Sequence, residues 1–590
     1  MEFYKNRKAV YELELKKLTT RYNIISASRL LMAIGVFSFG YYAFNAEKPL
    51  VFTCLMLFCA VEFVLLMNRH ALVRNRKLRA GALVKINQEE MDYLDGKSIP
   101  FDNGKAFIDF THPYSHDLDV FGDRSLYHNL NRAQSYRGSI KLAESLTQLL
   151  PIDDILLNQE AVKELAGKLE FRQEIMALSR VNKESEDVYQ KLMLWTNGVS
   201  KNTPLISNLT AYILPISFVV SVIAYIVTSI STWSTAAEWL FGFNLLFILF
   251  HVKAIKAEMK DTTEIDNIIH HYGLIIEQIE KEPFSSEKLK AIQAKLNAGE
   301  GSAGKKIKKL AIYFSRLDSM DNVFGAALMN GVMLYHFYAF KSLLKWKKEN
   351  AAAIAGWLEV IAEIEALGSL GNLYYNNPDF TFPTINTNYK IEFKGLAHPL
   401  LNKENRVRND ITFDSVFMIL TGSNMSGKST FLRSLGINMV LAGAGAPVCA
   451  SAANVHPLPV LVSMRLSDSL SDNESYFFAE VKRLRYIMDQ LADKMAFVLL
   501  DEILRGTNSD DKRTGTVKVI RKMIALNAAG AIATHDIEVC ELAKEYPSQL
   551  VNRCFEAQIE NNELYFDYCL RDGICRNKSA TFFMEKMGVI

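Results

Sequence analysis

Four long apolar runs, grouped in two pairs, constrain the architecture of this chain more than any other feature. Residues 30–46 and 49–68 form the first pair, with only a short turn between them. The second pair has an apolar centre at 209–230 and a further run at 235–252. A helix that crosses a bilayer needs about 20 apolar residues, with a lower limit of about 17. The runs at 49–68 and 209–230 meet this length and the other two lie near the limit. We therefore expect two transmembrane helical hairpins, with buried core helices as the alternative.

Basic residues flank both pairs of apolar runs. They are Lys16, Lys17, Arg21, Arg29, Arg69, Arg74, Arg76, Lys77 and Arg79 around the first pair, and Lys201, Lys253, Lys256 and Lys260 around the second. The turns inside each pair carry almost no basic charge, so the positive-inside rule places both termini and every soluble part in the cytoplasm. The expected protein is a multi-pass protein of the cytoplasmic (inner) membrane. We expect no cleaved signal peptide, because the first apolar run begins only at about residue 30.

A glycine-rich stretch in the last third of the chain predicts a phosphate-binding loop. Residues 420–430 read LTGSNMSGKST and fill the pattern G-x-x-x-x-G-K-[ST]. The apolar run at 416–420 suits a buried strand and residues 431–443 suit a helix, which is the setting that this loop requires. Lys428 is then expected to reach the β- and γ-phosphates of a nucleotide, and Ser429 to bind Mg²⁺. The loop residues expected at the nucleotide are Gly422, Ser423, Asn424, Met425, Ser426, Gly427, Lys428, Ser429 and Thr430.

Two further strand ends carry polar residues suited to ATP hydrolysis. Residues 496–502 read AFVLLDE, so Asp501 is a candidate Mg²⁺ ligand and Glu502 a candidate general base that orients water. A buried strand that ends in solvated acids is the simpler alternative. Residues 530–536 read GAIATHD, and His535 could sense the γ-phosphate at the carboxyl edge of the sheet, although a lone histidine is more often structural. Lys428, Glu502 and His535 are thus the predicted catalytic residues of an ATPase that uses ATP and Mg²⁺.

Several of these segments together resemble the ATPase domain of the MutS family, the DNA mismatch-repair ATPases. The similar segments are TGSNMSGKST, LLDEILRGTN (499–508), ATHD (533–536), ESYFFAE (474–480), VRND (407–410), AHPL (397–400) and GAPVCA (445–450). The resemblance implies that Ser475 contacts the nucleotide of the opposite subunit, that Glu480 is the acid of the same segment, and that Asn409 lies near the adenine. The active form is then expected to be a homodimer with composite sites.

The resemblance continues upstream and implies the domain organisation. Residues 117–146, 155–165 and 357–373 are similar to helices of the MutS core. The fold expected is an α/β P-loop (ABC-type) ATPase domain preceded by a long-helix MutS-like core, with two transmembrane hairpins. The expected parts are an N-terminal segment with the first hairpin (1–80), the first part of the core (81–200), the second hairpin (201–255), the second part of the core (256–385) and the ATPase domain (386–590).

The chain also departs from that family, which leaves two functions open. Its formal net charge is only +2, and residues 1–400 contain no F-x-E mismatch-reading motif. The hairpins stand about where the DNA-gripping parts of the family would be. One hypothesis is an ATP-dependent protein that binds mismatched or branched DNA at the membrane, together with a membrane or repair partner. The alternative is a mechanochemical ATPase coupled to lipid or to a membrane protein, without DNA.

Two basic runs and one carboxylate each allow more than one role. The runs at 305–309 and 345–348 suit a solvated helix face, anionic lipid or, less well, DNA. Glu62 interrupts the run at 49–68 and is either functional or simply close to a helix end. The seven cysteines form no C-x-x-C pair, so we expect reduced cysteines that serve packing.

Overall fold

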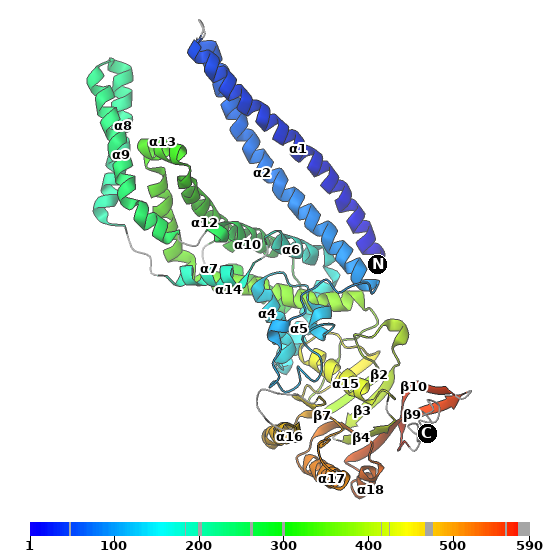
Figure 1. The fold of residues 1–590 in the computed structure, drawn as a ribbon. Coiled ribbons are helices and arrows are strands. Elements are labelled where there is room, and N and C mark those ends of the chain that lie inside the picture. Colours follow the sequence, from blue (N-terminus) through cyan, green and yellow to red (C-terminus); the bar gives the residue numbers. More distant parts are fainter. Residues whose placement is uncertain are drawn as a thin grey trace.

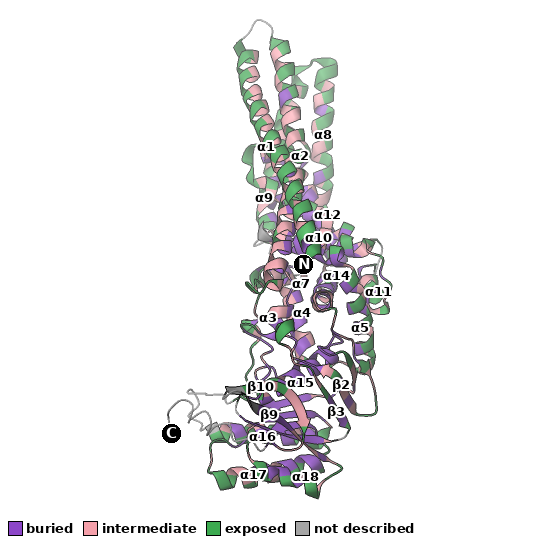
Figure 2. Cartoon of the chain, turned by 90° about the vertical axis from the view of Figure 1, so that its right-hand side faces the viewer, coloured by how far each residue is buried: buried purple, intermediate pink, exposed green. Residues whose placement is uncertain are grey.

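The protein consists of two helical hairpins, a helical body and a sheet domain. The computed structural model describes residues 1–45, 49–182, 184–198, 203–259, 263–297, 301–414, 416–423, 425–465, 476–560 and 563–575. Both hairpins rise from the helical body on the side opposite the sheet domain, as the two views agree (Figures 1 and 2). Mostly helical segments thus precede one C-terminal α/β region.

The first hairpin is longer than the apolar runs that predicted it. Helix α1 (Glu2–Asn45) and helix α2 (Pro49–Leu94) pack antiparallel along their length. The Tyr42 and Phe52 rings meet near the turn, with centroids 5.5 Å apart. At mid-height a Cβ added to Gly35 would lie 2.9 Å from Cys59 Sγ, so the glycine permits the close approach of the helices. Helix α2 also runs unbroken across residue 80, where the sequence analysis placed a boundary.

The second hairpin is shorter and has a third helix beside it. It consists of α8 (Leu205–Thr228) and α9 (Ser231–Glu258), and α9 is packed by α13 (Val323–Met333). The Asn244 side chain of α9 donates a hydrogen bond to the Gly331 carbonyl of α13, at 2.7 Å. Within the described residues, α1, α2, α8 and α9 are the four helices long and apolar enough to cross a membrane. Their surfaces are largely exposed in the isolated chain (Figure 2).

The helical body joins the hairpins to the sheet domain. Its helices are η1 (Lys105–Phe107), α3 (Leu126–Leu130), α4 (Tyr136–Thr147), α5 (Ile152–Gly167), α6 (Leu169–Val181), α7 (Glu186–Asn197), α10 (Thr263–Lys281), α11 (Glu287–Ala294), η2 (Lys295–Asn297), α12 (Ala303–Asp318), η3 (Ser319–Asp321) and α14 (Tyr335–Asn376). Helix α14 is 42 residues long and packs against α4, α5 and α12. It contributes an almost continuous series of buried side chains to the main core.

The two basic runs differ in their surroundings. In the run 345–348, Trp346 and Lys347 are buried, and Lys347 Nζ lies 2.6 Å from a carboxylate oxygen of Glu258. That run is therefore not a simple solvated face. In the run 305–309, Lys308 pairs with Glu277 while Lys305 and Lys309 are exposed.

The sheet domain contains two sheets. Strands β1 (Thr384–Ile385), β2 (Lys390–Leu396), β3 (Asn409–Asp414) and β5 (Ala452–Val455) form one sheet in the order β1-β5-β2-β3. Strands β4 (Phe417–Gly422), β6 (Val460–Ser463), β7 (Phe497–Asp501), β8 (Ala529–Ala533), β9 (Leu550–Glu560) and β10 (Glu563–Asp572) form the other, in the order β10-β9-β4-β8-β7-β6. The helices of this domain are η4 (Lys403–Asn405), α15 (Lys428–Gly443), α16 (Tyr476–Asp493), α17 (Ser509–Ala525), η5 (Ile537–Glu541) and α18 (Leu542–Glu545).

The larger sheet has a parallel centre that is buried on both faces. Strand β4 pairs in parallel with β8 and β9, and β7 pairs in parallel with β8 and β6. Every residue of β4, β7 and β8 is buried, as the continuous apolar sequences of parallel strands require. The carboxyl ends of β4, β8 and β7 therefore lie side by side at one edge of the sheet.

A buried carboxylate, Glu90, joins the first hairpin to α14. Its two oxygens accept hydrogen bonds from Arg132, and Asn372 and Asn376 of α14 donate to them at 3.2 and 3.3 Å. Tyr4 of α1 donates to Asn376 at 2.9 Å. Glu90 and Arg132 are 2% and 4% exposed, so this ion pair is screened from water. The junction of α1, α2 and α14 thus depends on one hydrogen-bonded ion pair.

Replacing Glu90 by alanine should destabilise the protein strongly. Arg132 would remain buried without its partner, and breaking one side of a buried ion pair costs about 3–5 kcal/mol. Thermal unfolding of the full chain in detergent measures the effect. The matched control is Glu12→Ala, which removes an exposed pair with Lys8 in α1 and should change stability by less than about 1 kcal/mol. Equal melting temperatures for the two variants would contradict the assignment.

Candidate functional site

The glycine-rich loop connects the end of β4 to the start of α15. Gly427 has φ 98° and Met425 has φ 68°, both in the left-handed region that favours glycine. A Cβ on Gly427 would lie 2.9 Å from Cδ1 of Tyr568, and a Cβ on Gly422 would lie 2.9 Å from the Phe555 carbonyl oxygen. The loop therefore requires glycine at both positions, for space and, at Gly427, for backbone conformation.

The Lys428 ammonium is folded back onto the loop. Its Nζ donates to the carbonyl oxygens of Gly422 and Ser423 at 2.9 and 3.0 Å and lies 3.4 Å from Nε2 of His535. Burial lowers the pKa of Lys428, and the nearby Glu502 and Asp501 carboxylates oppose that shift. A buried cation held by main-chain oxygens at the first turn of α15 is well placed to exchange those oxygens for a bound anion.

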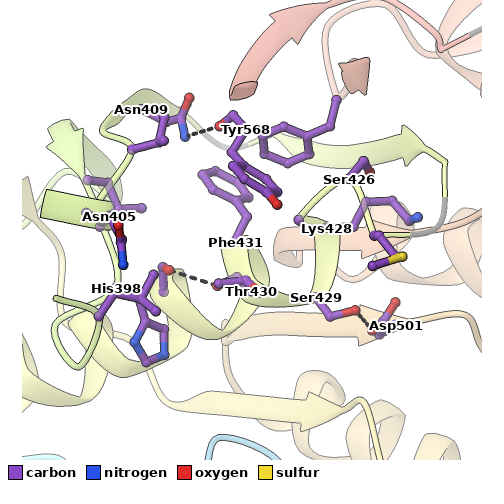
Figure 3. A pocket seen from close by; sticks show the side chains of 18 of the residues that line it. His398, Asn405, Asn409, Ser426, Lys428, Ser429, Thr430, Phe431, Asp501 and Tyr568 are labelled. Carbon is purple, nitrogen blue, oxygen red and sulfur yellow. Dashed lines mark hydrogen bonds between the residues drawn. The ribbon is translucent and has the colours of Figure 1, made fainter. Parts of the chain in front are cut away.

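Ser429 at the start of α15 meets Asp501 at the end of β7. The Ser429 hydroxyl at the start of α15 donates to Oδ2 of Asp501 at 2.6 Å (Figure 3). Asp501 ends β7 and is 8% exposed. A hydroxyl and a carboxylate are oxygen ligands of the kind that Mg²⁺ prefers, so this donor pair fits that ion.

Glu502 and His535 form the adjacent pair. His535 Nε2 lies 2.7 Å from Oε1 of Glu502. The hydrogen bond with His535 is the largest cause that lowers the pKa of Glu502 to about 2. Glu502 itself has φ 49°, and Arg505 Nε donates to its carbonyl at 3.0 Å. The carboxylate is thus ionised and held in one orientation beside Lys428 and Asp501.

Lys428, Ser429, Asp501 and Glu502 line one pocket of about 570 Å³, and His535 lies just behind them. That volume is within the range of small-molecule sites. Polar groups gather at the loop end, from Ser426 to Asp501, whereas His398 and Asn405 lie at the other end and the rings of Phe431 and Tyr568 lie between (Figure 3). The Asn409 amide donates to the Tyr568 carbonyl at 3.0 Å and accepts from the Leu570 N–H at 2.7 Å, which fixes β10 beside the pocket.

The residues predicted from sequence lie in four groups. Met425, Ser426, Gly427, Lys428, Ser429, Thr430, Asn409, Asp501 and Glu502 line the pocket. Gly422, Ser423 and His535 lie against Lys428 without being part of the lining. Asn424 and Ser475 lie outside the described residues. Glu480 accepts the Leu504 N–H at 2.7 Å and so anchors the turn after Glu502 instead of entering this pocket.

Sequence reasoning missed several lining residues, among them Phe431 and Tyr568. Phe431 follows the loop motif on α15, and its spacing is that of an ordinary core residue. Tyr568 belongs to β10, which has no motif, and only sheet pairing brings it to Gly427. His398 also lines the pocket and lies in the AHPL segment, which the family resemblance places near the adenine; burial lowers its pKa to about 4. The segment resemblance was the one signal that pointed to it.

The C-terminal part of the chain is thus a mixed α/β domain with a pocket at the carboxyl ends of its parallel strands. The family model of MutS domain V matches residues 418–587. The chain is 31% identical over 242 residues to the DNA mismatch repair protein MutS of Thermotoga maritima, covering 40% of this chain and 30% of that protein. It is 31% identical over 196 residues to the human MutS protein homolog 4, covering 32% of this chain and 20% of that protein. These matches support membership of the MutS family, as a divergent member that spans less than a third of the length of these relatives.

The low pKa of Glu502 predicts a pH-dependent contribution to stability. Its pKa in the folded protein is about 2, against 4.5 for the unperturbed group. The ionised side chain therefore stabilises the fold above about pH 4.5, and this contribution is lost as the pH falls towards 2. The melting temperature of the wild type should exceed that of Glu502→Gln at neutral pH, and the difference should shrink below about pH 4.5. A difference that is constant from pH 3 to pH 7 would contradict the depressed pKa.

Proposed function

We propose that the chain is a membrane-anchored ATPase that binds and hydrolyses ATP in the pocket at the ends of β4, β7 and β8. The observation that carries the proposal is the meeting of two hydrogen-bonded groups at adjacent strand ends: Ser429 with Asp501, and Lys428 and Glu502 with His535. These residues come from three separate segments of the chain. A cation, a hydroxyl and two carboxylates at a helix N-terminus match the requirements of phosphoryl transfer to water.

We infer one orientation for a nucleotide in the pocket, with its phosphates at the glycine-rich loop. The buried hydroxyl oxygens of Ser423 and Ser426 have no hydrogen-bond partner among the described residues, which suits a loop that awaits an acceptor or donor from a ligand. The polyphosphate is proposed to lie on this loop and on Lys428. A flat base would then extend past the rings of Phe431 and Tyr568 toward His398, where ring stacking is available. Ser429 and Asp501 would hold Mg²⁺, which would neutralise phosphate charge.

Hydrolysis is proposed to depend on Glu502 and His535. With a pKa of about 2, Glu502 stays ionised and is a weak proton acceptor, so its main role is to orient the attacking water. His535 fixes the carboxylate through the 2.7 Å contact and lies beside Lys428, which links both residues to the γ-phosphate position. Lys428 must release the two loop carbonyls when phosphate binds, and this exchange would couple nucleotide binding to the loop conformation.

A homodimer is proposed to complete each site. Each subunit's Ser475 would contact the nucleotide of the other, as the resemblance implies. Phe477 and Phe478 belong to the same segment, in the first turn of α16, and are exposed, and exposed aromatic side chains favour a partner surface. Two-fold symmetry would place two such surfaces against two pockets.

The membrane part of the proposal is supported by the four long apolar helices. Their apolar windows are between 0% and 22% buried, so a bilayer would cover what the chain leaves exposed. The flanking basic residues favour a cytoplasmic pocket. Movements of the sheet domain would reach both hairpins through α14, which suggests mechanical coupling to lipid or to a membrane partner. ATP-dependent DNA binding is the second candidate function, because the relatives carry names of mismatch repair proteins.

Two substitutions separate nucleotide binding from hydrolysis. Lys428→Ala should abolish tight ATP binding, because the loop loses the cation that balances the phosphates. Glu502→Gln should retain ATP binding and lower kcat by at least about 100-fold, because an amide cannot orient or deprotonate water equally well. Nucleotide-binding and ATPase assays on the full chain in nanodiscs measure both effects. Lys518→Ala, on an exposed position of α17, is the control and should behave as wild type. Unchanged turnover in Glu502→Gln would refute its role.

DNA dependence separates the two candidate functions. We expect the ATPase rate in nanodiscs to be indifferent to homoduplex, mismatched and branched DNA at two salt concentrations. Stimulation or inhibition by one form of DNA that weakens steeply with salt would favour the DNA-binding alternative, because phosphate contacts release counterions.

A further inference from the structure

We propose that a groove between α1 and α2 binds the phosphate headgroup of an anionic phospholipid. This inference rests on the proposed membrane anchorage of the first hairpin and adds a specific lipid site to it. The groove has a volume of about 330 Å³ and is lined by residues of both helices: Arg21, Ile24, Ile25, Arg69, Leu72, Val73 and Arg76.

The groove combines three guanidinium groups with an apolar wall. Arg21 comes from α1, whereas Arg69 and Arg76 lie seven residues apart, two turns along one face of α2. The remaining lining residues are aliphatic. Guanidinium groups bind phosphate oxygens in pairs of parallel hydrogen bonds, and aliphatic side chains suit the glycerol and upper acyl chain of a lipid.

These three arginines are available to a ligand. All three are exposed, and none forms an ion pair or side-chain hydrogen bond with another of the described residues. Arg79, one turn further along α2, shows the contrast, because its Nε donates to Glu174 at 2.5 Å. Residues 16–29 and 69–79 contain no acidic side chain, so neither helix supplies local compensation for the positive charge. The charge of the groove is thus complementary to an anion.

The height of the groove along the hairpin favours a lipid over a soluble anion. Arg69 is the first residue after the apolar run 49–68, and at 1.5 Å per residue Arg76 and Arg21 lie about 10–13 Å beyond the apolar boundary. Arginine side chains at this level can reach the headgroup layer of the cytoplasmic leaflet. A free phosphate ion would gain nothing from Ile24 and Leu72, which are 59% and 62% exposed.

Native mass spectrometry of the full chain, with equal amounts of phosphatidylglycerol and phosphatidylcholine added in detergent, tests the site. The groove variant is Arg21→Gln/Arg69→Gln/Arg76→Gln. The matched control is Lys16→Gln/Lys17→Gln/Arg74→Gln, which removes the same charge from exposed positions of the same two helices outside the groove. The wild type and the control should retain phosphatidylglycerol preferentially, and this preference should fall at least about tenfold in the groove variant. Melting temperatures of all three proteins verify that they are folded.

Two results would overturn the proposal directly. An equal loss of phosphatidylglycerol binding in both variants would mean unspecific attraction by all basic residues of the first hairpin. Displacement of phosphatidylglycerol by excess inorganic phosphate would mean a site for a free anion. Flotation with vesicles of phosphatidylcholine alone distinguishes the membrane anchorage from the lipid site. Failure of the wild type to float would refute the anchorage and the lipid site with it. A wild type that floats with these vesicles but shows no preference for phosphatidylglycerol in the mass spectra would refute the lipid site alone.

Discussion

The buried Glu90–Arg132 pair is the interaction on which the arrangement of the parts depends. It lies where the base of the first hairpin, the loop before α4 and the last turns of α14 meet. Desolvation of two charges is costly, and here Asn372 and Asn376 supply the additional hydrogen bonds that offset it. Arg172 of α6 extends the network through Asn372 at 2.7 Å. Because its members are joined by directional hydrogen bonds, the network specifies one orientation of the hairpin relative to the body, which apolar packing alone would define less sharply.

The sheet domain is held to the same body by polar contacts of a different kind. Asp117 accepts the main-chain N–H groups of Met464 and Arg465, at 2.7 and 2.8 Å, just after β6. On the other side, Gln159 of α5 donates to the Pro383 carbonyl at 2.9 Å, next to β1. These contacts bind the helical body to both sheets, so the pocket and the hairpins belong to one connected framework. Local changes at the ends of β4 and β7 are therefore not isolated from the helices above them.

Sequence could predict the features whose chemistry lies within a few consecutive residues. The loop at 422–430, the acids at 501 and 502 and His535 each end an apolar strand, and parallel pairing of β4, β8 and β7 brings those ends together. Tyr568 could not be predicted, because its position depends on the antiparallel pairing of β9 with β10 and on the Asn409 contact. Likewise, the apolar runs located the hairpins but not the length of α1 and α2. Their charged halves remain helical because the two helices pack on each other and on the helical body, a contact that hydropathy does not encode.

The uninterrupted course of α14 has a mechanical consequence. Its first residue, Tyr335, follows α13 at the second hairpin, and its last, Asn376, belongs to the Glu90 network near the sheet domain. At 1.5 Å per residue the helix is about 63 Å long. A continuous helix of that length can act as a lever: a small tilt at the sheet end would become a displacement of several ångströms at the second hairpin. Rearrangements too small to repack a core would thereby become steps large enough to shift one helix past another.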